Sequence, residues 1–74
     1  MSNKPIHTVK HGNAWVNRRE GSPEALSSHR TQAAAIDQGR RQARRDETEH
    51  FIHGQNGQIR ARNSYGNDPY PPRG

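Results

Sequence analysis

The chain contains no cysteine, and this absence limits the chemistry that it can perform. Without thiols there is no disulfide, which small secreted domains commonly need, and no thiolate ligand for a metal ion. Aromatic residues are also scarce, with one Trp, one Phe and two Tyr in 74 residues. A disulfide-stapled fold and a cysteine-ligated metal centre are therefore excluded.

Long apolar runs are missing as well. Only 26% of the residues are hydrophobic, and no run approaches the roughly 20 residues of a membrane-spanning helix. The segment from Met1 to Lys10 lacks the apolar centre of a signal peptide. We therefore expect a cytoplasmic protein that has no membrane partner.

A chain of 74 residues allows one domain with a small core. We expect a flexible N-terminus at residues 1–5, a single domain over residues 6–66, and a Pro-rich tail at residues 67–74 that favours polyproline II geometry. Because apolar groups are few, a dimer that shares its core is an alternative to a monomer.

Positive charge is the abundant property of this sequence. Twelve Lys and Arg residues against seven Asp and Glu give a formal net charge of +5. Only Lys4 and Lys10 are lysines, so the excess is almost all arginine. Arginine suits bidentate contacts to phosphate, which favours a polyanionic partner. The alternative is a small soluble domain that is basic but does not bind a polyanion.

Alternation and turn residues predict two β-hairpins. Gly12-Asn13 and Asn56-Gly57 are both acceptable two-residue hairpin turns, and Asn-Gly predicts type I′ geometry. The strands are expected at residues 6–10, 14–20, 48–53 and 58–63. Residues 21–30, which are rich in Ser, are expected to form a loop.

One helix is expected between the hairpins. Thr31 is a good N-cap, and residues from Gln32 to about Arg45 carry three early alanines and late arginines, which suit the helix dipole. One face of this helix is built of small residues and is predicted to pack closely on a sheet. The predicted contact set is Ala35, Ile36, Gly39 and Ala43 against Val9, Val16, Ile52 and Ile59. The fold class is therefore α+β, a ββαββ domain in which one helix packs on one face of a small antiparallel sheet.

The sequence resembles a bacterial family known as the domain of unknown function 2188. The residues that carry the resemblance are Trp15, Arg19-Glu20-Gly21, Thr31 to Ile36, Glu49 to His53, Gly57-Gln58-Ile59 and Asn63 to Pro69. The resemblance covers nearly the whole chain from about His7. It implies a fold and no mechanism.

The two turns predict which side chains share the sheet face opposite the helix. With two-residue turns, Lys10 faces Trp15, and Phe51 faces Arg62. If the aliphatic residues face the helix, the opposite face is aromatic and basic. This candidate face for nucleic acid or a partner comprises Lys10, Trp15, Phe51, His53, Arg60 and Arg62. Alternatively, Trp15 is buried by the helix, by the tail with Tyr65 and Tyr70, or by a second subunit.

No motif in the sequence predicts catalysis, a cofactor or a metal ion. Five histidines are present, but they lack the spacing and the convergent carboxylates of a usual metal site. There is no nucleophile motif and no glycine-rich phosphate loop, so we expect no enzyme and no small-molecule substrate. A secondary basic patch is expected on the outer helix face, at Arg40, Arg41 and Arg44.

The sequence therefore predicts a non-enzymatic binding module. The leading form is a nucleic-acid-binding accessory protein, in which bases stack on aromatic rings and arginines meet phosphates. The alternative is a homo-oligomeric or protein–protein interaction module whose open sheet face is closed by a partner. The environment of Trp15 distinguishes the two.

Overall fold

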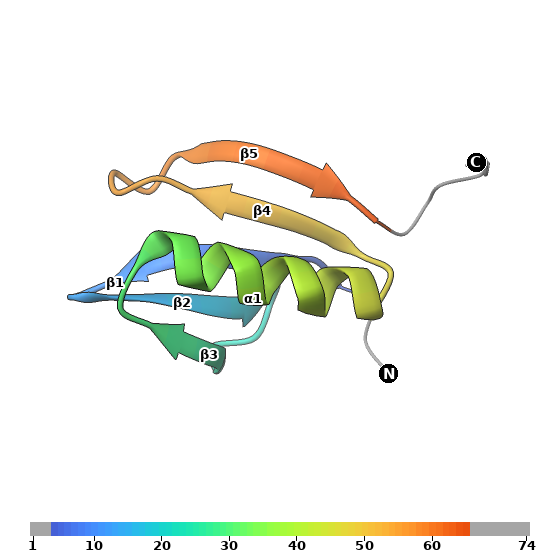
Figure 1. Cartoon of the computed structure of the whole chain (residues 1–74), viewed down its shortest axis with the longest axis horizontal. Helices are drawn as coiled ribbons and strands as arrows, with labels where there is room; N and C mark the ends of the chain where they lie inside the picture. Colours follow the sequence, from blue (N-terminus) through green and yellow to red (C-terminus); the bar gives the residue numbers. More distant parts are fainter. Residues whose placement is uncertain (1–3, 66–74) are drawn as a thin grey trace.

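Five strands form one sheet, and a single helix packs on one of its faces (Figure 1). The computed structural model describes residues 4–65, so the predicted tail at residues 67–74 and the first three residues lie outside the described part. The elements are β1 (Ile6–His11), β2 (Ala14–Arg19), β3 (Ala25–His29), α1 (Gln32–Arg45), β4 (Glu49–His53) and β5 (Ile59–Ser64). The α+β class is confirmed, and within residues 4–65 no helix is long and apolar enough to cross a membrane.

The sheet is mixed rather than purely antiparallel. Its strand order is β3-β2-β1-β4-β5, and β1 pairs with β4 in parallel while every other pairing is antiparallel. The parallel pair arises because α1 carries the chain from β3, at one edge, across the sheet to the far side of β1. The expectation of an antiparallel sheet is therefore corrected at this one pairing.

Strand β3 lies where a loop was predicted. Its five residues, Ala25–His29, pair with β2, and their side chains are exposed or half-buried. An edge strand of this kind obtains its structure from backbone pairing rather than from burial of an apolar face. Its sequence therefore lacks the apolar alternation by which strands are recognised.

The first hairpin has the predicted turn and the predicted register. Val9 pairs with Val16, and Lys10 pairs with Trp15. Gly12 has a φ of 63° and Asn13 does not have a positive φ, which matches a type II′ turn.

The turn of the second hairpin differs from the prediction. Gly54 N–H donates to the Gln58 carbonyl at 2.8 Å, and Gly57 N–H donates to the Gly54 carbonyl at 3.0 Å. Only Gly57 has a positive φ, of 87°, so the loop has three residues and ends in a left-handed glycine. The type I′ prediction is therefore wrong. A bulge near Ile52 and His53 absorbs the extra residue, so the predicted pairing of Phe51 with Arg62 is still found.

Helix α1 begins and ends through hydrogen bonds at its caps. The Thr31 hydroxyl accepts from Ala34 N–H at 3.1 Å, which confirms the predicted N-cap. At the C-terminus, Thr48 N–H donates to the Ala43 carbonyl at 2.9 Å, and Glu47 N–H donates to the Arg44 carbonyl at 3.3 Å. This is a Schellman motif, in which glycine is the usual residue at the position of Glu47. Glu47 instead adopts a φ of 53°.

On β1 and β2 the helix packs on the face that was expected to be open, whereas on β4 it packs on the predicted face, where Ile52 is 8% exposed. The small helix residues Ala35, Gly39 and Ala43 are buried as predicted, whereas Ile36 is half-buried. Asn17 donates to the Ala35 carbonyl, so the side of β2 that carries Asn17 and Trp15 faces the helix. Val9 and Val16 lie on the other face, and Ile59 is 57% exposed, so their predicted contact with the helix is wrong.

The core beneath Gly39 is polar. Thr8, Asn17 and His50 are at most 1% exposed, and their side chains are joined by hydrogen bonds. The Thr8 hydroxyl donates to Asn17 Oδ1 at 2.5 Å and therefore accepts from His50 Nε2 at 2.7 Å. Asn17 also donates to the Ala35 carbonyl at 2.9 Å and to Ser27 Oγ at 3.0 Å. We call Thr8, Asn17 and His50 the polar triad.

Burial keeps His50 neutral. Desolvation, followed by the charges of Arg40 and His7, lowers its pKa to about 4. Its Nδ1 is buried and has no hydrogen-bond partner among the described residues. A second proton on this ring would therefore be a buried donor without an acceptor, which is costly.

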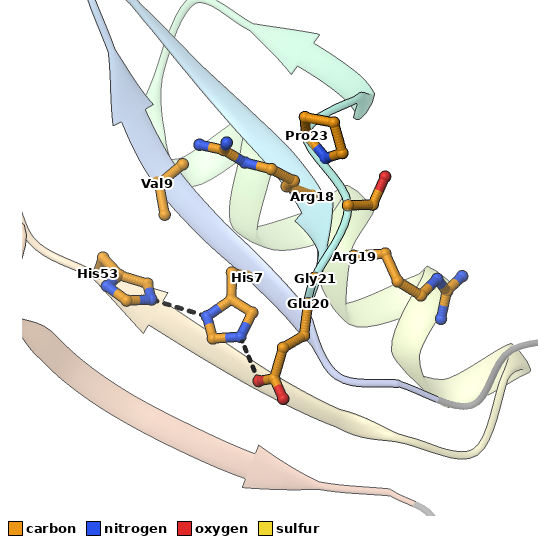
Figure 2. Close-up of a pocket in the computed structure, with 9 residues that line it drawn as sticks. His7, Val9, Arg18, Arg19, Glu20, Gly21, Pro23 and His53 are labelled. Carbon is orange, nitrogen blue, oxygen red and sulfur yellow. Dashed lines mark hydrogen bonds and ion pairs between the residues drawn. The ribbon is translucent and has the colours of Figure 1, made fainter.

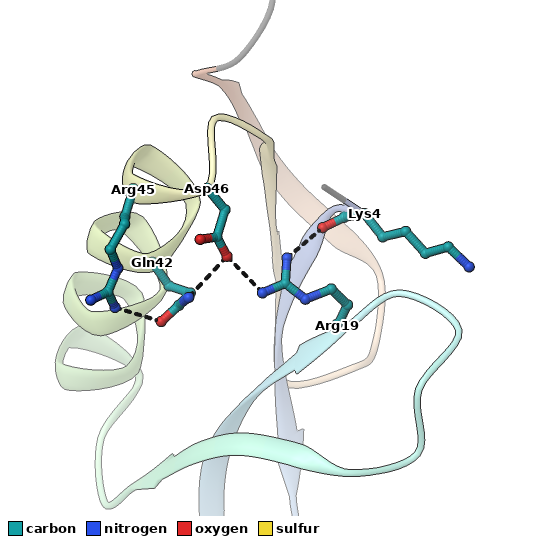
Figure 3. Close-up of polar contacts among 5 residues, drawn as sticks. All are labelled: Lys4, Arg19, Gln42, Arg45 and Asp46. Carbon is teal, nitrogen blue, oxygen red and sulfur yellow. Dashed lines mark hydrogen bonds and ion pairs between the residues drawn. The ribbon is translucent and has the colours of Figure 1, made fainter. Parts of the chain in front are cut away.

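A second polar network joins the end of α1 to β2 (Figure 3). Arg19 donates to Asp46 Oδ2 at 2.6 Å and to the Lys4 carbonyl at 3.0 Å. Gln42 donates to the same carboxylate oxygen at 2.9 Å. The hydrogen bonds from Gln42 and Arg19 lower the pKa of Asp46 below its usual value.

Candidate functional site

The sheet face opposite α1 carries no helix within the described residues, and we call it the open face. Its side chains come from four strands and include aromatic, basic and aliphatic groups. The open face is defined by His7, Val9, Val16, Arg18, Phe51, His53 and Arg62. Strand pairing brings these residues together from distant parts of the sequence, since β1 lies between β2 and β4.

A pocket of about 480 Å³ lies on the open face where β2 runs into the following loop (Figure 2). His7, Val9, Arg18, Glu20, Pro23 and His53 are among its lining residues. Arg18 extends along the face toward Val9, whereas the side chain of its neighbour Arg19, which also lines the pocket, runs in the opposite direction (Figure 2). Among residues 4–65, no hydrogen-bond or ion-pair partner holds the Arg18 guanidinium. A guanidinium without a counter-ion, on a half-buried arginine, is suited to bind an anion.

A chain of hydrogen bonds runs along one wall of this pocket (Figure 2). Glu20 Oε1 lies 2.9 Å from His7 Nε2, and His7 Nδ1 lies 2.9 Å from His53 Nε2. His53 Nδ1 lies 3.2 Å from the Gly57 carbonyl, which belongs to the loop between β4 and β5. The chain therefore links three separate segments across the open face.

Phe51 stands between two cross-strand neighbours. The His7 ring stacks on it with centroids 4.9 Å apart and an angle of 12° between planes, and the Arg62 guanidinium lies 6.0 Å from its centroid. These neighbours come from β1 and β5, on opposite sides of β4. The two sides of the ring are thus occupied, and Phe51 is not a free stacking platform for a nucleic-acid base.

The predicted face is only partly assembled. Phe51, His53 and Arg62 lie together on the open face. Trp15 is 6% exposed and, with Lys10, lies on the side of the sheet that faces the helix, so the prediction that they share the open face is wrong. Arg60 is exposed on β5, and its side chain lies against Gly54. The docking of α1 on the side of β2 that carries Asn17 and Trp15, rather than on the side that carries the valines, accounts for the difference.

Sequence reasoning missed His7, Arg18 and Glu20. The predicted register of the first hairpin already paired His7 with Arg18, on the same side as Val9 and Val16. Strand alternation was therefore the signal that could have found them, but the prediction placed the wrong face of β1 and β2 toward the helix. Glu20 follows β2, and its contact with His7 depends on how the loop after β2 folds back.

The secondary basic patch lies on the outer side of α1. Asp37 pairs with Arg40 at 2.9 Å and with Arg41 at 3.0 Å, while Arg44 is exposed. These arginines are thus partly neutralised within their own helix. Across residues 4–65, no three histidine or carboxylate side chains converge in a way that would hold a metal ion.

Comparison with known proteins gives a family match. A family model described as an uncharacterised protein conserved in bacteria (DUF2188) matches residues 6–65. No curated protein and no solved structure matches the chain.

Proposed function

The chain belongs to the bacterial family of uncharacterised proteins DUF2188, and we propose that it is a non-enzymatic binding module whose open face contacts the phosphates of single-stranded nucleic acid. The observation that carries this proposal is Arg18, whose guanidinium lies in the pocket of the open face without a counter-ion among the described residues. The net charge of +5 supports the same class of partner.

The basic residues of the open face supply a path for a polyanion. Arg18 lies on β2, and Arg62 lies three strands away on β5, with His7 and His53 between them on β1 and β4. Arg60 adds a further cation on the exposed edge strand. A flexible single strand can follow such a row of basic side chains, with its phosphates placed on the arginines.

The proposed contact is to phosphates rather than to bases. Base stacking needs an accessible ring face, but Trp15 is buried and Phe51 lies between His7 and Arg62. A phosphate contact carries little base information, so we expect weak discrimination between sequences and strong dependence on salt.

Titration of a fluorescently labelled oligonucleotide at several salt concentrations tests the proposal. The wild-type protein is expected to bind at about 50 mM salt and to lose affinity as salt rises. Arg18→Ala and Arg62→Ala should each weaken binding and reduce the slope of log K against log salt by about 0.7, the value for one phosphate contact on a single strand.

Arg41→Ala is the matched control, because it removes the same charge from the opposite side of the molecule. It should lower affinity far less than Arg18→Ala, since Arg41 is already paired with Asp37. Equal losses of affinity from both variants would mean that the nucleic acid contacts the secondary basic patch on α1, or that only the net charge matters, and would refute the contact at Arg18. No binding at about 50 mM salt would remove the nucleic-acid proposal.

The second candidate is an interaction module that self-associates or binds a protein. It is favoured by the edge strand β5, in which all six residues are exposed and Ile59 is 57% exposed. A sheet edge with an exposed apolar residue offers a surface for strand pairing. A molecular mass in solution that rises to twice the monomer value as protein concentration increases, together with no oligonucleotide binding, would favour this candidate over the first.

A further inference from the structure

The histidine chain on the open face has an acceptor at each end. The Glu20 carboxylate accepts a hydrogen bond from His7 Nε2–H, and the Gly57 carbonyl accepts a hydrogen bond from His53 Nδ1–H. The contact in the middle, between His7 Nδ1 and His53 Nε2, needs one further proton. All three contacts are therefore satisfied only when the four ring nitrogens hold three protons.

Three protons on two imidazole rings amount to one positive charge. Two neutral rings hold two protons, so one of the three contacts would lose its hydrogen. Two charged rings hold four protons, which would set one N–H against another across 2.9 Å. The geometry thus selects the singly charged pair over both alternatives.

We propose that His7 and His53 share one positive charge and that this charge makes anion binding in the Arg18 pocket dependent on pH. Both rings line the pocket together with Arg18. Loss of the shared proton removes a positive charge beside the bound anion and leaves the charge of Glu20 unopposed. It also breaks one link of the chain that connects β1, β4 and the Gly57 loop.

The other charges around the pair do not replace it. Arg18 projects into the same pocket from β2, and Arg62 lies beyond Phe51 on β5. Lys4 lies beside Gly21 at the pocket rim, and His50 is on the helix side of β4 and neutral. The remaining charged or titratable groups that share the face or border the pocket are Arg19, Glu20, Glu49 and His11. Arg19 is paired with Asp46, and the hydrogen bond between His7 Nδ1 and His53 Nε2 involves none of these four groups.

Nuclear magnetic resonance of the ¹⁵N-labelled wild-type protein tests the proton count directly. Correlation of ring nitrogens with ring protons should show hydrogen on His7 Nε2 and on His53 Nδ1, and a third proton between the remaining two nitrogens. The spectra are recorded between pH 6 and 8, the range in which histidine ordinarily changes charge. A pair that holds two protons over that entire range would overturn the proposal.

Oligonucleotide titration then tests the consequence, which rests on the proposed function. At fixed low salt, wild-type affinity should rise roughly fivefold from pH 8 to pH 6, the effect of one added charge near a bound phosphate. His53→Asn should abolish most of this rise, because the shared proton loses one of its two sites. His11→Asn, which changes an exposed histidine on β1, should keep it.

The two failures are distinguishable. Absence of oligonucleotide binding at every pH would refute the proposed function and the pH-dependent binding, while the nitrogen spectra still decide whether the proton is shared. Binding that is present and equally pH-dependent in wild type and His53→Asn would refute the role of the pair and leave the proposed function intact.

Discussion

Gly39→Ala is expected to destabilise this protein, although alanine is the better helix former. A Cβ built on Gly39 would lie 2.6 Å from Asn17 Oδ1, 2.7 Å from His50 Nε2 and 3.0 Å from His50 Cε1. The atoms that it meets belong to the buried polar triad, where side chains cannot swing into solvent. The added methyl group must therefore push the helix away or break the triad.

The magnitude follows from two opposing effects. Replacing glycine by alanine inside a helix stabilises it by about 1 kcal/mol. Overpacking a core costs about 1–3 kcal/mol, and each buried hydrogen bond that is left unsatisfied costs about 1–3 kcal/mol. The steric and hydrogen-bond penalty outweighs the gain in helix propensity. We expect a net loss of about 2 kcal/mol, which for a domain of this size lowers Tm by about 10 °C.

Urea denaturation followed by Trp15 fluorescence measures this loss, because Trp15 is buried in the folded state. Arg41→Ala, on the outer helix face, serves as control and should change the free energy of unfolding by less than about 0.5 kcal/mol. In an Asn17→Ala background, the cost of Gly39→Ala should shrink, since the nearest clashing atom is gone. A Gly39→Ala protein as stable as wild type would refute the close approach of α1 to the triad.

Three further outcomes are expected. The pKa of His50 is about 4 in the folded state and near 6.5 in the unfolded state, so the unfolded state binds a proton first as pH drops. The free energy of unfolding should therefore fall by up to about 3 kcal/mol between pH 6.5 and pH 4. In a pH series of urea titrations, His50→Gln should reduce this dependence on pH. Glu47→Gly should raise the free energy of unfolding by about 0.5–1 kcal/mol, because glycine adopts the positive φ of the helix end without strain; a lower Tm would contradict this. Gly57→Val should cost about 1 kcal/mol or more from backbone strain alone, since a Cβ there meets no atom within 4 Å, and unchanged thermal stability would count against the left-handed turn.

Local sequence determined the elements whose signals lie within a few residues. The helix from Gln32 to Arg45 and its cap at Thr31 follow from propensity and capping, which depend on neighbours along the chain. The pairing of Val9 with Val16 follows from a two-residue turn, which sets the register of its two strands. The pairing of Phe51 with Arg62 was predicted from the wrong turn length, and a bulge restored it. Strand β3 was missed because its stabilising partner is a backbone edge supplied by β2.

Tertiary structure decided which face of the sheet the helix covers, and with it the candidate site. Alternation assigns residues to two faces, but both faces carry apolar groups, with Val9 and Val16 on one and Trp15 on the other. Which face the helix covers depends on contacts between distant segments, above all the close packing of Gly39 against Asn17 and His50. The same packing leaves His7, His53 and Arg18 facing away from the helix. Their proximity arises because β1 lies between β2 and β4, and no local pattern in the sequence encodes that order.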